Sequence, residues 1–103
     1  RYGAQLADCQ PSNYKEVVMP VISRFYGIAI IMYFNDHNPP HCHAKYSGYE
    51  ARFDFQGNIL EGELPRRATG FVQEWISQHQ SELGSNWKKA RSGEPLDYIS
   101  PLE

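Results

Sequence analysis

The sequence predicts a single α+β domain, in which an antiparallel sheet of about four strands is followed by two helices packed on one face. Between residues 21 and 64, apolar runs and alternating stretches are separated by short turns that contain Gly and Asn. From residue 65 to residue 91, apolar side chains recur at helical spacing. The length of 103 residues fits one domain.

Composition narrows the class of protein. The chain is 41% hydrophobic and 21% charged, which excludes disorder for most of it. Ten Lys and Arg against twelve Asp and Glu give a net charge of −2, so no overall field attracts nucleic acid or an anionic membrane. The longest uncharged apolar run, residues 27–34, is too short to span a bilayer, and no secretory signal opens the chain. We therefore expect a cytoplasmic protein that does not bind membranes.

The first residues differ from the rest. Residues 1–18 have mixed polarity and no sustained period, whereas Met19-Pro20 resembles a natural start. We expect residues 1–18 to be an N-terminal extension or leader, and residues 19–103 to form the domain.

Four strands are expected near residues 21–34, 41–46, 49–55 and 59–64. Within the first of these, Gly27 predicts a bulge or bend that separates a short leading strand from the main one. A two-residue turn at Ser47-Gly48 sets the register of the next pair, with His41 opposite Asp54, His43 opposite Arg52 and Lys45 opposite Glu50. A further turn at Gly57-Asn58 would place Phe55 opposite Leu60 and Phe53 opposite Gly62.

The first helix is expected to open at Leu64-Pro65 and the second to run from about Ser81 to Arg91. The spacing places Trp75 and Trp87 in the core and makes His79 a half-buried core histidine.

Three of the four histidines fall within residues 36–43, and this is the candidate site. On a strand, His41 and His43 project from one face about 7 Å apart. With Asp54 opposite, these three residues are the candidate catalytic group. His37, His41 and His43 are the candidate ligands of a divalent metal, although no cofactor is fixed by the sequence. The alternative is a polar strand face, where replacing a histidine costs little stability, beside a simple turn.

Arg66 and Arg67 oppose the helix dipole in the first helical turn. Together with Arg52 they are candidates for binding an anion or a partner, and the alternative is salt bridges to Glu61 and Glu63. Cys42 faces the core, which favours a small apolar role over a metal ligand or nucleophile.

The chain also resembles a known family. From Met19, the residues MPVISRFYGIAIIMYFNDHNPPHCHAKYSGYEA, and further on LPRRA, EWI and ARSGEPL, resemble the bacterial family of domain of unknown function DUF4160, over about residues 19–103. The resemblance implies a small toxin–antitoxin-like component with a second small protein as partner and an RNA target. It assigns no catalytic residues.

Two functions therefore remain open. One is a partner-binding component, with the histidine strand, Arg66 and Arg67 as its surface and a homodimer as one form of association. The other is a nuclease or hydrolase, metal-assisted or not, that uses His41, His43 and Asp54. Catalysis needs these groups to converge in a concave, partly dry site, whereas an interface needs an exposed patch.

Overall fold

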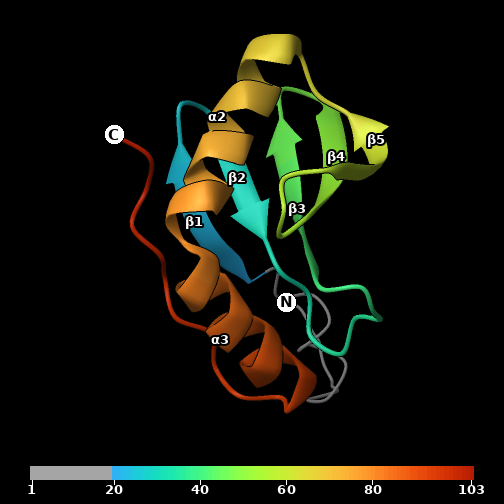
Figure 1. Cartoon of the computed structure of the whole chain (residues 1–103), viewed down its shortest axis with the longest axis vertical. Coiled ribbons are helices and arrows are strands. Elements are labelled where there is room, and N and C mark those ends of the chain that lie inside the picture. The colour runs from blue at the N-terminus through green and yellow to red at the C-terminus, as the bar shows by residue number, and fades with distance from the viewer. Residues whose placement is uncertain (1–19) are drawn as a thin grey trace, which may run out of the picture.

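The computed structural model describes residues 20–103 as a five-stranded antiparallel sheet followed by two helices, as Figure 1 shows. The strands lie side by side in chain order. Their bounds, and those of the helices, are β1 Val21–Phe25, β2 Ile28–Ile31, β3 His41–Tyr46, β4 Tyr49–Asp54, β5 Ile59–Glu63, α2 Arg66–Gln78 and α3 Gln80–Arg91. The predicted α+β class is confirmed, with five strands rather than about four. The expected extension, residues 1–18, lies outside the described residues.

The extra strand arises because residues 21–34 form a hairpin instead of one bent strand. Tyr26 and Gly27 have φ angles of 51° and 79°, so both adopt the left-handed conformation of a two-residue hairpin turn. Phe25 then lies opposite Ile28. An aromatic residue in the first turn position hides the turn in the sequence, because the apolar run continues through it.

The hairpin of β3 and β4 has the predicted register. His41 lies opposite Asp54, His43 opposite Arg52 and Lys45 opposite Glu50. Ser47 and Gly48 both have positive φ, as a tight two-residue turn requires.

The predicted register of β4 and β5 is wrong. Phe53 lies opposite Ile59 rather than Gly62, and Gly62 lies opposite Ala51. The pairing is irregular between Arg52 and Phe53, where a bulge changes the count. The turn itself is wider than two residues, because the Asp54 carboxylate accepts hydrogen bonds from the backbone N–H groups of Gln56 and Asn58.

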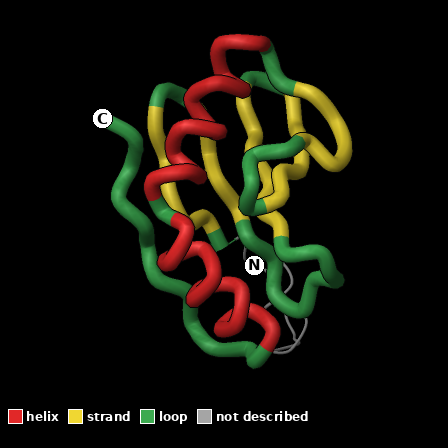
Figure 2. The backbone as a smooth tube through the Cα atoms, viewed as in Figure 1, coloured by secondary structure: helices red, strands yellow, loops and turns green. Residues whose placement is uncertain are grey.

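Both helices cover the same face of the sheet, as predicted (Figures 1 and 2). Trp75 of α2 is fully buried and packs against Phe25, while Trp87 of α3 packs against Phe55. His79 joins the two helices; it is half-buried, contacts Trp75 and pairs with Glu82 at 2.7 Å. No helix within residues 20–103 has both the length and the apolar character needed to cross a membrane.

The C-terminal tail lies beside β1, at the left of Figure 2. The N–H of Ile99 donates to the carbonyl of Ile22 at 2.7 Å, and the Trp75 indole N–H donates to Ser100 at 2.8 Å. Asn86, buried in α3, exchanges two hydrogen bonds of 2.9 Å with the backbone of Asp97. The tail therefore covers the β1 edge of the sheet, while β5 forms the opposite edge.

Candidate functional site

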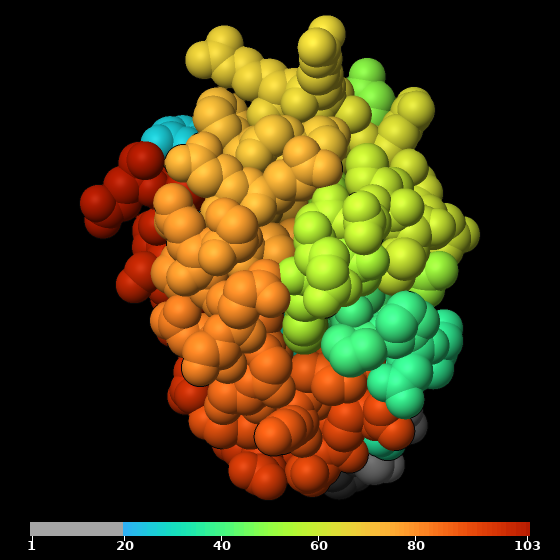
Figure 3. Space-filling model, in the orientation of Figure 1, coloured from blue at the N-terminus to red at the C-terminus, as the bar shows by residue number. Residues whose placement is uncertain are grey.

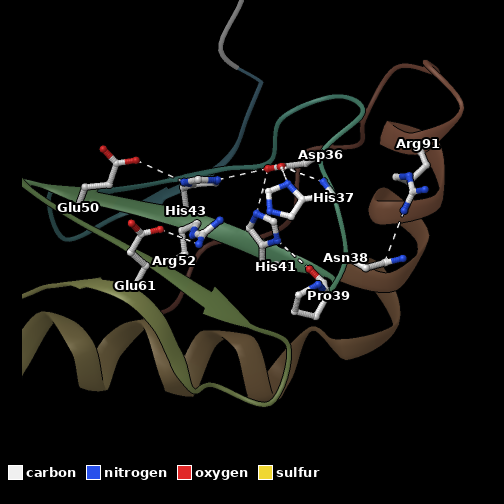
Figure 4. Close-up of polar contacts among 10 residues, drawn as sticks. All are labelled: Asp36, His37, Asn38, Pro39, His41, His43, Glu50, Arg52, Glu61 and Arg91. Atoms are coloured by element: carbon white, nitrogen blue, oxygen red, sulfur yellow. Dashed lines mark hydrogen bonds and ion pairs between the residues drawn. The ribbon is translucent and has the colours of Figure 1, made fainter.

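Three side chains converge where the loop after β2 returns to the start of β3 (Figure 4). Asp36 comes from the loop, and His41 and His43 are the first and third residues of β3. One ligand atom from each lies within 4.8 Å of the other two. We call Asp36, His41 and His43 the His2Asp cluster.

His41 is almost completely enclosed, with 1% of its surface exposed. Its Nδ1 lies 2.8 Å from the carbonyl oxygen of Pro39, and its Nε2 lies 2.9 Å from Oδ2 of Asp36. The centroid of its ring lies 5.4 Å from that of Trp87, a residue of α3. The expectation that His41 lies on an open strand face, where substitution costs little, is therefore wrong. The predicted strand is present, but Trp87 of α3 packs against its first residue, His41.

His43 lies two residues further along the same face of β3 and keeps 13% of its side chain exposed. Its Nδ1 is 3.3 Å from Oε2 of Glu50, and its Nε2 is 3.5 Å from Oδ2 of Asp36. That Nε2 is buried and forms no hydrogen bond with any described residue. Desolvation lowers the pKa of His43, aided by the nearby His41 and opposed by the two carboxylates. The lowered pKa favours the neutral form of the ring.

Asp36 connects the three histidines of this region. Burial raises its pKa, but the backbone N–H of His37, the charge of His41 and the side chains of both cluster histidines outweigh that effect. The pKa of Asp36 is therefore lowered, and its carboxylate is ionised at neutral pH.

Helix α3 holds the loop that carries Asp36. The N–H of Asn35 donates to the carbonyl of Ala90 at 3.1 Å, and Arg91 donates to the side chain of Asn38 at 3.5 Å. The loop is therefore fixed at both ends of the turn by the last residues of the helix.

Asp54 and His37 do not lie where the predicted catalytic group and the predicted metal-ligand set place them. Asp54 lies opposite His41 in the ladder, but its Oδ1 and Oδ2 accept hydrogen bonds of 2.9–3.1 Å from Gln56 and Asn58 in the following turn. His37 is 76% exposed, and its Nδ1 lies 3.1 Å from Oδ1 of Asp36, whereas both cluster histidines contact Oδ2. Asp36, absent from the predicted groups, takes the place expected for Asp54. The sequence signal was its position in the same DHNPPHCH segment.

A cavity of about 330 Å³ adjoins His43 on the sheet face opposite the helices. Its walls include Glu50, Arg52 and Glu61. Arg52 and Glu61 form a 2.6 Å ion pair, so the guanidinium predicted to meet a partner or anion is already paired within the sheet. The cavity is lined by charged groups that interact with each other, unlike the mostly apolar pockets that hold small ligands.

Arg66 and Arg67 are exposed at the start of α2, where no side chain caps the helix and no acidic residue occupies the first turn. Within residues 20–103, neither arginine forms a salt bridge, and Glu61 pairs with Arg52 instead. Arg67 lies over the ring of Phe71 at 5.7 Å. The structure thus does not contain the salt bridges to Glu61 and Glu63 that would explain these cations internally.

Cys42 is fully buried among core residues. Burial, assisted by the charge of Asp54, raises the pKa of its thiol to about 12. It points away from the cluster histidines on either side of it, which agrees with its expected apolar role.

Comparison with known proteins identifies a family. No curated protein and no solved structure matches the chain. The sequence model of a domain of unknown function, DUF4160, matches residues 27–88, a range that contains the whole His2Asp cluster and Arg66 and Arg67. Because the match covers more than half of the chain, the protein belongs to the DUF4160 family.

Proposed function

We propose that this chain is a cytoplasmic bacterial protein that acts by binding a second small protein, as a component of a toxin–antitoxin-like module. The partner adds a strand to β5 and contacts the first turn of α2. The observation that carries this proposal is the pair of exposed arginines, Arg66 and Arg67. Within the described residues neither forms a salt bridge, and both lie beside a sheet edge that no described strand covers.

The two edges of the sheet differ. The tail covers β1, whereas β5 pairs only with β4 in the described part of the chain. Ile59 and Leu60, both 41% exposed, lie on β5. An uncovered edge strand with apolar side chains is a template for strand addition by another chain.

The charges indicate which partner fits. Cations in the first turn of a helix are unfavourable by a few tenths of a kcal/mol each, so Arg66 and Arg67 weaken α2 unless a carboxylate meets them. Side chains of this turn project from the top of the molecule in Figure 3, next to β5. A partner strand followed by Asp or Glu residues would satisfy both the edge and the arginines.

The test is co-purification of the tagged chain with the small protein encoded beside it. Replacing Arg66→Glu and Arg67→Glu together should weaken the complex, and more steeply at low salt, because screening hides exposed charges. The matched control is Arg24→Glu with Lys88→Glu, which changes net charge equally on exposed residues away from β5. Leu60→Lys should also weaken the complex, since it removes an apolar contact and a lysine on an edge strand opposes strand addition. Equal loss in the control pair would contradict this placement of the interface.

A second candidate function, a small nuclease or hydrolase, is favoured by one observation: Asp36, His41 and His43 converge as reacting groups would. The burial of His41 opposes it, because a substrate cannot reach that ring in this conformation. RNA cleavage by the purified chain that disappears in His43→Ala, with the fold retained, would favour this candidate over partner binding.

A further inference from the structure

A single proton does not satisfy all the hydrogen-bonding groups of the His2Asp cluster. A carbonyl oxygen can only accept, so the 2.8 Å contact with Pro39 assigns the proton of His41 to Nδ1. In a neutral ring, Nε2 then carries a lone pair. That lone pair faces Oδ2 of Asp36, another acceptor, at 2.9 Å. Two acceptors at this distance require a positive species between them.

His43 repeats the arrangement. The Glu50 carboxylate, 3.3 Å from Nδ1, also accepts only, which leaves the lone pair on Nε2. This buried Nε2 forms no hydrogen bond with the described residues and lies 3.5 Å from the same Oδ2 of Asp36. Figure 4 shows both rings turned toward that single oxygen.

A proton satisfies only part of this arrangement. Placed on Nε2 of His41, it completes the contact with Asp36 but leaves Nε2 of His43 buried without a partner, which is costly. A second proton, on Nε2 of His43, would complete the set only by placing two imidazolium rings with centroids 5.2 Å apart in a mostly buried cluster, where like charges repel. A cation that accepts three lone pairs would satisfy all three groups at once.

The distances suit such a cation. Zinc binds imidazole nitrogen and carboxylate oxygen at about 2.0–2.2 Å, so neighbouring ligand atoms in a tetrahedral site are about 3.3 Å apart. The two contacts to Asp36, at 2.9 Å and 3.5 Å, lie on either side of this value. All three ligand atoms lie within 4.8 Å of one another, so closing around an ion needs only small side-chain shifts.

The groups around His41 and His43 also match those found around metal-binding histidines. A histidine that binds a metal commonly donates its other N–H to a backbone carbonyl or a carboxylate, which fixes the tautomer and the ring plane. His41 does so to Pro39 and His43 to Glu50. Aromatic rings fix the planes further: Trp87 lies 5.4 Å from His41, and Tyr33 lies edge-on 4.7 Å from His43.

We infer that the chain binds one divalent transition-metal ion through Nε2 of His41, Nε2 of His43 and Oδ2 of Asp36. Two nitrogens and one oxygen suit zinc or its neighbours in the first transition row, not magnesium or calcium, which prefer oxygen ligands. His37, which contacts the other oxygen of Asp36, supports that carboxylate and is not a ligand. This inference is independent of the proposed partner.

The test is a calorimetric titration of the full chain with zinc, after a chelator has removed any bound metal. The affinity tag is removed, and Cys9→Ser is the background, so that neither a histidine tag nor this thiol binds the ion. We expect one ion per chain. His43→Ala and Asp36→Asn should each weaken binding by more than about 100-fold, since even residues that only support a ligand contribute about 10- to 100-fold. Glu50→Ala should weaken zinc binding by about 10- to 100-fold, as expected for a residue that supports a ligand.

Two controls separate ligands from nearby histidines. His79→Ala removes a histidine outside the cluster and should leave the affinity unchanged, and His37→Ala should cost less than His43→Ala. Circular dichroism establishes that each variant is folded. The visible spectrum of the cobalt-loaded chain is a second readout, because it reports the ligands rather than stability. Absence of tight one-to-one binding of zinc and cobalt by the folded chain would overturn the inference. So would an affinity that survives both ligand substitutions, or one that falls equally in His37→Ala.

Discussion

Gly62, in β5, and Gly48, in the turn before β4, offer a matched test of how the β5 edge is built. Both have positive φ, 82° and 87°, so an alanine at either position incurs roughly 1–2 kcal/mol of backbone strain. They differ in space. A Cβ at Gly62 would overlap the carbonyl oxygen of Glu50 and lie 3.0 Å from Cα of Ala51, whereas nothing lies within 4 Å of one at Gly48. The clash is with backbone, which cannot move without separating β4 from β5.

We therefore expect Gly48→Ala to destabilise the chain by roughly 1–2 kcal/mol and Gly62→Ala by roughly 1–3 kcal/mol more, the usual cost of overpacking. Urea unfolding at equilibrium measures both. In thermal melts, each kcal/mol corresponds to about 4–8 °C in a domain of this size. Equal losses at the two positions would refute the close approach of β5 to β4 at Gly62, and with it the observed register.

Three further predictions follow from the described side chains. Burial raises the pKa of Asp54, but hydrogen bonds in the turn, chiefly from Asn58, outweigh that effect, so the pKa is lowered from its usual 3.8. The carboxylate therefore stabilises the folded chain above pH 3.8, and this stabilisation is lost as the pH falls through the lower pKa of the folded state. The difference in Tm between wild type and Asp54→Asn should shrink in acid. In a Cys9→Ser background, iodoacetamide should not label Cys42 until guanidinium unfolds the chain, because the thiol is buried and its pKa is about 12; labelling of the native chain would contradict this burial. Removing the enclosed His41 ring should cost roughly 2–4 kcal/mol in urea unfolding, against less than about 0.5 kcal/mol for the exposed His37→Ala, and similar losses would contradict the packing of Trp87 over His41.

Turn chemistry and side-chain alternation predict the structure correctly where residues close together in the sequence determine it. The register of β3 with β4 follows from a two-residue turn at Ser47-Gly48 and from alternation on both strands, so sequence pattern alone places His41 opposite Asp54. The helices are equally predictable from the sequence, because their apolar stripe is long and starts after Pro65.

The same rules fail where the chain turns unexpectedly. The turn after Phe25 is hidden because Tyr26 occupies a position that Asn or Gly usually takes, and an aromatic residue there signals strand. The shift between β4 and β5 depends on the Asp54 carboxylate, which widens the turn by capping two backbone N–H groups. Such capping by a side chain leaves no periodic trace in the sequence.

The composition of the candidate site is only partly predictable for a related reason. Cross-strand pairing predicts which residues are neighbours in the ladder, so it favours Asp54 as the carboxylate for His41. It cannot predict where a loop returns. Asp36 reaches the histidines because Asn35 and Asn38 are held by the end of α3, a contact between residues more than fifty positions apart. The burial of His41 has the same origin, since Trp87 belongs to that helix.

The two proposed sites lie at opposite ends of β3, and this separation decides how their tests are interpreted. The His2Asp cluster uses the first and third residues of the strand, whereas Arg67 lines a cavity with Tyr46, the last residue. At about 3.4 Å per residue, His41 and Tyr46 are about 17 Å apart along the strand. Substitutions so far apart, with no shared partner, act independently. Loss of metal binding in His43→Ala should therefore leave partner binding measurable, and loss of the partner in the Arg66 and Arg67 variant should leave the metal affinity intact. If one substitution removed both activities, the cause would be the fold of β3 itself, which the stability measurements detect directly.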